Sequence, residues 1–328
     1  MRAILLLVTL LFTLHAEENE YTLGEGFQVA SLPLYIGGYI SSDIAVKEHE
    51  KKYRLDDIAV LSYGAYEKFS YLGEFEFKDF YTYIDRDGVT SSEKDRDIHT
   101  ERLYVVYNHD ENFALQVGKY NSNIGFWNLL PINVLRETTS SPKSTSIIFP
   151  KFSTGLDASY SSYSEGELRI NVTLQENASL DDGYNNYSID KHYGVGMAYE
   201  LDAYTLKVNG GYFHSYEAEK LEYLYMLLSA KYESEKFQIL GEIGSQRDKS
   251  DFTTKYAGYL QGVYRFSEEH IGILRVESFD DTKRDTQDNI AIVGYTYRPL
   301  YPIALKAEYQ LHKNDDDNAL LFSFSVLF

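Results

Sequence analysis

The last eleven residues, 318–328, read NALLFSFSVLF and carry no charged side chain, although the whole chain has a formal net charge of −19. Successive side chains of a β-strand point to opposite faces, so this stretch predicts a strand with one apolar, mostly aromatic face. That face consists of Leu320, Phe322, Phe324, Val326 and Phe328. Because an exposed apolar edge strand promotes aggregation, we expect this face to be covered by a protein core or by lipid.

The same alternation recurs through the chain. Residues 167–175 (ELRINVTLQ) and 303–311 (IALKAEYQL) each set apolar side chains against charged ones, and residues 73–80 (GEFEFKDF) set phenylalanines against glutamates. Period-two alternation predicts half-buried strands, and helical periodicity is almost absent. Two predicted strands, 34–46 and 54–67, alternate poorly and leave their faces open. The sixteen predicted strands are 34–46, 54–67, 69–83, 98–109, 112–120, 152–162, 166–176, 191–201, 204–217, 221–234, 236–246, 252–266, 270–279, 287–298, 302–313 and 318–328.

The connections between these strands alternate between short turns and longer, more polar loops. We predict longer loops at residues 84–97 and at residues 121–151, and the second of these is the longest loop and the third of the long loops along the chain. This rhythm is typical of transmembrane barrels with short turns on one side and long loops on the other. A secreted β-sandwich or β-helix would show similar alternation, but neither explains the loop rhythm, and no fixed-length repeat occurs. We therefore predict an all-β, transmembrane antiparallel β-barrel of about 16 strands.

The N-terminus predicts export. Arg2 precedes an apolar run from Ala3 to Leu14, and a small residue, Ala16, stands before an acidic segment. A short basic start, an apolar stretch and a small residue at the break are typical of a secretory signal peptide. The domain division is then 1–16 signal peptide, 17–33 short N-terminal periplasmic lead and 34–328 barrel. The chain has no cysteine, so disulfides do not contribute to its stability.

Together, the signal, the sixteen alternating strands and the closing FSFSVLF (322–328) resemble the bacterial outer-membrane porins, in particular the general 16-stranded porins. The resemblance implies a homotrimer in the outer membrane, in contact with lipid and lipopolysaccharide. It also implies an insertion signal at Phe324, Val326 and Phe328, read by the barrel-insertion machinery. Residues 117–128 (VGKYNSNIGFWN) are loosely similar to the porin O and P group. They depart from its pattern at Ile124–Gly125, and no concentrated basic cluster for phosphate selection is present.

In general porins the third external loop folds inward and narrows the pore, and the resemblance implies this role for residues 121–151. The segment FWNLLPINVL (126–135) is too apolar to lie in water, which agrees with packing inside a barrel. An external flap or a loop that latches a trimer remains an alternative. The candidate constriction residues are Trp127, Arg136, Glu137, Lys143 and Lys151.

The polar faces of the strands supply the remaining candidate pore residues. If the apolar faces contact lipid, the charges must point into the barrel, where positive and negative groups occur in similar numbers. Rings of charge set ion preference, so a balanced wall predicts weak selectivity, with acidic loops favouring cations at the mouth. Many of these charges could instead only neutralise one another across strands. The candidates are Glu74, Glu76, Lys78, Arg102, Glu167, Arg169, Lys207, Arg265, Arg275, Glu277, Lys306 and Glu308.

The function that follows is a porin, a water-filled channel for passive diffusion of small hydrophilic solutes and ions. The alternative is a non-conducting barrel that acts as a surface adhesin through its external loops. The seven histidines after the signal are scattered, and no hydrolase, metalloprotease or phosphate-binding motif occurs. We therefore predict no catalytic, cofactor-binding or metal-binding residue, and no nucleic-acid partner.

Overall fold

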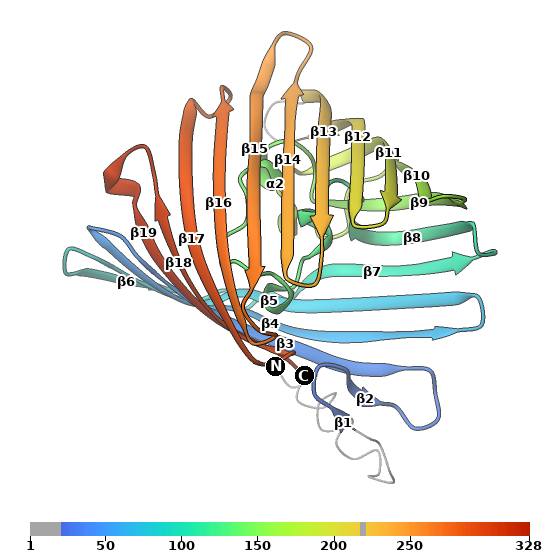
Figure 1. The fold of residues 1–328 in the computed structure, drawn as a ribbon, viewed down its shortest axis with the longest axis horizontal. Helices are drawn as coiled ribbons and strands as arrows, with labels where there is room; N and C mark the ends of the chain where they lie inside the picture. The colour runs from blue at the N-terminus through green and yellow to red at the C-terminus, as the bar shows by residue number, and fades with distance from the viewer. Residues whose placement is uncertain (1–20, 217–220) are drawn as a thin grey trace.

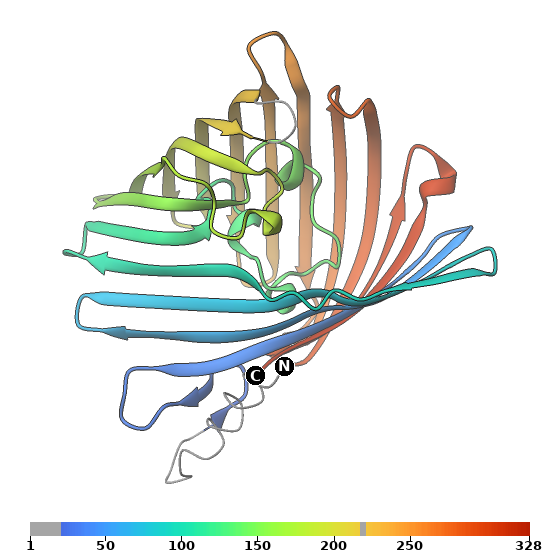
Figure 2. The same ribbon diagram turned by 180° about the vertical axis from the view of Figure 1, so that it is seen from behind.

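Most of the described residues form one closed β-sheet (Figures 1 and 2). The structure, a computed structural model, describes residues 21–216 and 221–328. The predicted signal peptide, residues 1–16, lies outside the described residues. The described part contains no helix that is long and apolar enough to cross a membrane.

Sixteen long strands form the barrel, and each matches a predicted strand within a few residues. Consecutive strands pair antiparallel, and the last strand pairs with the first, Leu327 opposite Tyr39, so that the sheet closes on itself. The fold class predicted from the sequence is therefore confirmed. The strands are β3 (Tyr35–Val46), β4 (Glu50–Tyr66), β5 (Phe69–Arg86), β7 (His99–Asn108), β8 (Phe113–Asn121), β9 (Phe152–Tyr163), β10 (Glu167–Gln175), β11 (Ile189–Leu201), β12 (Tyr204–Ser215), β13 (Leu221–Glu233), β14 (Phe237–Arg247), β15 (Phe252–Arg265), β16 (His270–Asp281), β17 (Thr286–Leu300), β18 (Ile303–Leu311) and β19 (Ala319–Leu327).

Three short strands extend the sheet beyond the barrel. β1 (Tyr21–Thr22) and β2 (Gly26–Gln28) form a hairpin in the N-terminal lead, and β2 pairs with the start of β3. β6 (Val89–Glu93) pairs with the end of β5 through a turn at Asp87–Gly88, where φ is 49° and 86°. Two consecutive positive φ angles are typical of a type I′ hairpin turn. The prediction of a loop over residues 84–97 is therefore wrong for this segment.

The two faces of the barrel differ in polarity. In β19, Phe322 and Phe324 point outward and are each 41% exposed, whereas Ser323 and Ser325 point inward and are 6% and 1% exposed. In β13 the exposure alternates in the same way: Leu224, Met226 and Leu228 are exposed, whereas the inner side chains Tyr225 and Leu227 are buried against the inner loop. A closed sheet with an apolar outer face satisfies its backbone hydrogen bonds internally, as a structure in lipid must.

Bulges in three neighbouring strands break this alternation. In β4, Asp56 and Asp57 together occupy the space opposite Ser41, and in β5 a bulge follows Lys78 at Asp79, where φ is 48°. In β7, the register shifts at Glu101. A bulge adds one residue to one strand, so adjacent side chains can point to the same face. These bulges explain why apolar and polar residues alternate poorly in the second predicted strand. They also turn several acidic side chains toward the inner face of the barrel.

Few residues are helical. η1 (Trp127–Leu129), η2 (Asn133–Leu135) and α2 (Ser144–Ile147) belong to the connection between β8 and β9, and the short η3 (Asp182–Tyr184) and η4 (Asp315–Asp317) belong to later connections. The connection 122–151, here called the inner loop, lies within the barrel (Figures 1 and 2). Its apolar side chains Ile147, Ile148 and Phe149 form a buried cluster with the inner faces of β12, β13 and β15.

Candidate pore-lining site

Side chains of β12 and β14 hold the start of the inner loop. Glu242, 3% exposed, accepts hydrogen bonds from the backbone N–H groups of Phe126 and, at 3.4 Å, Trp127. Lys207 Nζ donates to the backbone oxygen of Gly125 at 2.8 Å. Gly125 has φ of 66°, and a Cβ there would lie 2.6 Å from Glu242 Oε1. Glycine is therefore required at this turn, because a side chain would displace the carboxylate that fixes the loop.

Charged side chains of β16 and β18 hold the middle of the inner loop. Arg275, 1% exposed, forms an ion pair with Glu277 at 2.7 Å and donates from Nη1 to Thr138 Oγ1 at 2.9 Å. Glu308 accepts from the backbone N–H of Thr139 at 3.0 Å, and Lys306 Nζ donates to Asn133 Oδ1 at 2.8 Å. Hydrogen bonds to buried charged groups are among the stronger ones in proteins, so these contacts fix the loop against this wall.

The apolar residues of the inner loop pack on the barrel wall. Trp127, 3% exposed, lies edge-on to Tyr259 with 6.2 Å between ring centroids, and the guanidinium of Arg275 lies 5.4 Å from the Trp127 ring. Ile132 and Val134 form a second buried cluster with wall residues, including Tyr39, Ala59, Leu61 and Ala304. Removing these side chains from water favours the inward position of the loop.

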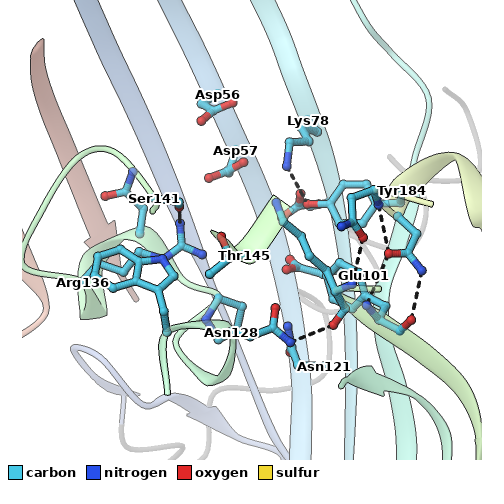
Figure 3. A pocket seen from close by; sticks show the side chains of 18 of the residues that line it. Asp56, Asp57, Lys78, Glu101, Asn121, Asn128, Arg136, Ser141, Thr145 and Tyr184 are labelled. Atoms are coloured by element: carbon cyan, nitrogen blue, oxygen red, sulfur yellow. Dashed lines mark hydrogen bonds between the residues drawn. The ribbon is translucent and has the colours of Figure 1, made fainter. Parts of the chain in front are cut away.

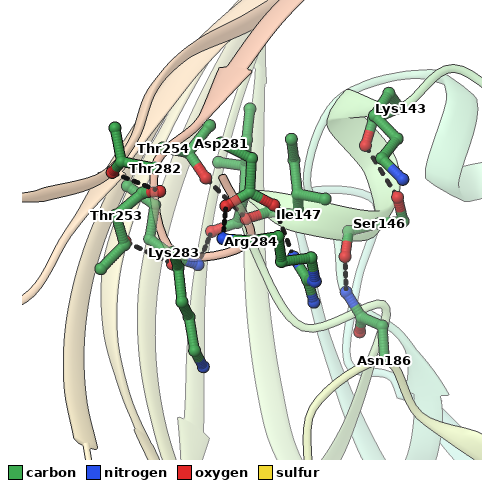
Figure 4. Close-up of polar contacts among 12 residues, drawn as sticks. Lys143, Ser146, Ile147, Asn186, Thr253, Thr254, Asp281, Thr282, Lys283 and Arg284 are labelled. Carbon is green, nitrogen blue, oxygen red and sulfur yellow. Dashed lines mark hydrogen bonds and ion pairs between the residues drawn. The ribbon is translucent and has the colours of Figure 1, made fainter. Parts of the chain in front are cut away.

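A second connection, residues 176–188, also packs against the inner loop. Asn186 Nδ2 donates to the backbone oxygens of Ser146 and Phe149, at 3.0 and 2.8 Å, and Asn186 Oδ1 accepts from the N–H of Lys151 at 2.8 Å. Thr254 of β15 holds the same turn from the other side, through the backbone oxygen of Ile147 (Figure 4). The end of the inner loop is thus clamped between residues 176–188 and β15.

A polar cavity of about 470 Å³ separates the inner loop from the wall of β3, β4, β5 and β7 (Figure 3). Acidic side chains line it mainly from the wall, and the loop contributes two cations. The acidic lining residues are Asp43, Asp56, Asp57, Glu76 and Glu101, and the basic ones are Arg54, Lys78, Arg136 and Lys151. Tyr39 from β3 and Tyr184 from residues 176–188 add aromatic surface to the lining.

The cations around this cavity differ in their environment. Arg54 is neutralised by Asp43, Asp79 and Asp56, at 2.6, 3.0 and 3.4 Å. Lys78 Nζ lies 4.7 Å from the centre of the Tyr184 ring. For Lys151 of the inner loop, burial first and the charges of Lys78 and Arg136 second lower the pKa to about 8.

The sequence-predicted pore residues therefore fall into several groups. The cavity is lined by Trp127, Arg136, Lys151, Glu76 and Lys78. Glu74 and Arg102 form an ion pair and are not among the residues that line this cavity. A second group contacts the inner loop instead, namely Lys207, Arg275, Glu277, Lys306 and Glu308. Glu137, itself in the inner loop, forms an ion pair with Arg298 of the wall at 3.1 Å. Glu167 and Arg169 line a smaller cavity of about 180 Å³ beside Phe126 and Leu129, with Lys207.

Two predicted residues lie away from the larger cavity. Arg265 pairs with Glu233 at 3.5 Å near a short turn, and Lys143 Nζ lies 5.7 Å from the centre of the Phe279 ring. Neither is among the described residues that line that cavity.

Sequence reasoning missed several cavity residues, namely Tyr39, Asp43, Arg54, Asp56, Asp57, Glu101 and Tyr184. The adjacent acidic pair Asp56–Asp57 within a predicted strand was a signal for a bulge, because regular alternation would turn one of the two carboxylates toward the apolar side.

No protein-family model and no curated protein sequence matches this chain. Solved structures match it in fold. The outer membrane channel DcaP of Acinetobacter baumannii matches with a TM-score of 0.60 and 12% identity, over 93% of this chain and 100% of the other. The anion-selective porin from Comamonas acidovorans matches with a TM-score of 0.56 and 9% identity, over 90% and 99%. OmpT of Vibrio cholerae in its trimer form matches with a TM-score of 0.55 and 10% identity, over 90% and 98%.

These matches extend over nearly the whole of each chain, at low sequence identity. The chain therefore has the fold of the bacterial outer-membrane porins, a closed antiparallel barrel of sixteen strands.

Proposed function

We propose that the protein is an outer-membrane porin, a water-filled channel through which small hydrophilic solutes and ions diffuse passively. The observation that carries this proposal is the charged cavity of about 470 Å³ between the inner loop and the wall of β3, β4, β5 and β7. The cavity lies inside a barrel whose outer face is apolar. A sheet that closes on itself can line an aqueous path through lipid, because its backbone polar groups pair with one another.

In this mechanism the inner loop narrows the path. A solute passes between the carboxylates of the wall and Arg136 and Lys151 of the loop, and the clamped position of the loop sets the width. The buried contacts of Glu242, Arg275 and Glu308 support a fixed rather than a mobile constriction. The transfer forms no covalent intermediate and requires no cofactor, so the proposed activity is not enzymatic.

The cavity charges give the proposed channel a weak preference for cations. Five acidic and four basic side chains line the cavity, which leaves one net negative charge. Charges that line a constriction act at short range on a passing ion and set its preference. Because the two signs nearly cancel, the preference is mild.

We place the protein in the bacterial outer membrane, in contact with lipid and lipopolysaccharide. Its apolar outer face and its closing aromatic strand support this location. Phe324, Val326 and Phe328 would then form the signal for the barrel-insertion machinery. The trimer form of OmpT from Vibrio cholerae, which shares the fold, supports a homotrimer.

The test is planar-bilayer conductance of the purified, refolded protein, with the reversal potential measured in a salt gradient. Stable steps of conductance with a modest cation preference would support the porin. Protein that is folded, as judged by its heat-dependent migration on a gel, but that gives no conductance would refute it. That result would favour a closed barrel that acts as a surface adhesin, an alternative motivated by the amount of chain packed inside the barrel.

A further inference from the structure

Three buried carboxylates meet on the inner wall beside the cavity. Glu74 and Glu76 of β5 and Glu101 of β7 are 0%, 1% and 6% exposed. One carboxylate oxygen from each lies within 4.8 Å of the others. The bulge at Glu101 creates this arrangement, because it turns Glu101 to the same face as Arg102. Three like charges at this separation repel one another and need compensation.

The hydrogen bonds around the cluster leave that compensation incomplete. The Tyr39 hydroxyl lies 2.9 Å from Glu74 Oε1, 2.6 Å from Glu76 Oε2 and 3.0 Å from Glu101 Oε2. A phenol has one O–H donor, so it satisfies one of these oxygens at a time. Arg102 Nε donates to Glu74 alone.

A separate observation concerns the other oxygen of Glu76. Glu76 Oε1 is buried and has no hydrogen-bond partner among the residues that the structure describes. A buried carboxylate oxygen without a partner is costly, because it has lost its water and gained nothing in return. A positive ligand at this position would remove that cost.

The charge left at the cluster indicates the kind of ligand. When all three carboxylates are ionised they carry −3, and Arg102, the cation paired directly with one of them, carries +1, which leaves −2 within this group. Lys78 adds a charge at the edge of the cluster, but Asp57 lies directly opposite it in the ladder and offsets it. A divalent cation would neutralise the remaining charge.

We propose that Glu74, Glu76 and Glu101 form a binding site for a hard divalent cation of the size of Ca²⁺. Calcium accepts six to eight oxygen ligands at about 2.3–2.6 Å, so oxygens on opposite sides of the ion are about 4.6–5.2 Å apart. The three carboxylate oxygens all lie within 4.8 Å of one another, so they can share one such shell. Magnesium demands near-ideal octahedral geometry and gives up its waters reluctantly, so three buried carboxylates suit calcium better.

The cavity gives the ion a path to this site. Tyr39, Glu76 and Glu101 all line it, so a hydrated ion can enter from the interior of the barrel and keep water as its remaining ligands. The bound ion would cancel two negative charges at the wall and lower the local attraction for monovalent cations. Binding itself requires only the folded barrel, and it does not depend on conduction.

The experiment measures calcium binding by isothermal titration calorimetry on the refolded, chelator-treated protein in detergent. We expect one strong site per chain. Glu76→Gln with Glu101→Gln should weaken it at least tenfold, because amides retain the shape but lose the charge. Asp316→Asn with Asp317→Asn, a matched loss of two carboxylates in the acidic segment 315–317, should leave it unchanged. If the double glutamine variant does not fold, Glu101→Gln alone provides the comparison.

Equal calcium affinity in the wild type and the Glu76/Glu101 variant would overturn the proposal, as would the absence of any strong site. The cluster would then be neutralised by shared protons. The binding assay and the conductance assay separate the two proposals. A folded protein that binds calcium without conducting refutes the porin alone, and one that conducts without binding calcium refutes the site alone.

Discussion

Removing the two loop cations from the cavity should make the proposed channel strongly cation-selective. In Arg136→Gln with Lys151→Gln, the net charge of the lining changes from −1 to −3, while both side chains keep a polar end. An ion at the centre of a sphere of 470 Å³ lies roughly 5 Å from its surface, and about 6 Å from a charge on the wall.

The size of the effect follows from these distances. In bulk water one unit charge at about 6 Å contributes about 0.7 kcal/mol, and screening in 0.1 M salt lowers this to about 0.4 kcal/mol. Losing two positive charges then favours a cation by about 0.8 kcal/mol and disfavours an anion equally. The difference of about 1.5 kcal/mol corresponds to roughly a tenfold rise in the cation-to-anion permeability ratio.

The assay is the reversal potential in a potassium chloride gradient at pH 6, where Lys151 carries its proton. Lys143→Gln is the control for Lys151→Gln, since it removes the same charge from the same loop at a position outside the cavity lining. We expect the control to remain close to the wild type. An equal shift in the two single variants would mean that the cavity is not the path of the ions, and it would refute the reasoning.

Three further predictions concern single positions. Because the pKa of Lys151 is lowered to about 8, raising the pH from 6.5 to 9.5 removes the charge of this side chain. The cation preference of the wild type should then increase, which is measured as a shift in reversal potential. The Lys151→Gln variant should show no such shift. Glu242→Gln weakens the charge-assisted hydrogen bonds to the backbone of Phe126 and Trp127, each worth about 1.5–3 kcal/mol. The inner loop should then be held less tightly, so that single-channel conductance and open-channel noise rise. Unchanged single-channel records would contradict a loop fixed by these bonds. Phe322→Arg, on the outer face, should destabilise the barrel in lipid vesicles by about 2–4 kcal/mol more than Phe322→Ala, as measured by urea unfolding; equal losses would mean that this face is not in lipid.

The barrel was predictable from sequence where alternation is regular. In the last strand, the sequence alone separates an outer face, with Phe322 and Phe324, from an inner face, with Ser323 and Ser325. A closed sheet repeats that pattern in strand after strand. The hairpin of β5 and β6 was also recognisable. Asp87–Gly88 is a sequence that favours two consecutive positive φ angles, but the charged residues around it suggested a loop.

The acidic wall of the candidate site was not predictable in the same way. Asp56, Asp57 and Glu101 reach the cavity through bulges, which depend on how neighbouring strands pair and leave only a weak signal within one strand. From a different connection, Tyr184 reaches Lys78 of β5 and Asn186 reaches the inner loop, so their role depends on contacts between segments far apart in sequence. Such contacts are set by the closed shape of the barrel rather than by local propensity.

The pairing of β19 with β3 also governs how the chain can fold. Leu320 lies opposite Val46 and Leu327 opposite Tyr39, and the backbone of Phe328 exchanges two hydrogen bonds with Gly38 at 2.7 Å. The two ends of the barrel must therefore meet across nearly the entire polypeptide, a contact of very high sequence separation that forms slowly. A chain shortened by one C-terminal strand would not form a smaller barrel. It would leave β3 and β18 as two unpaired edges, and it would be expected to aggregate rather than assemble.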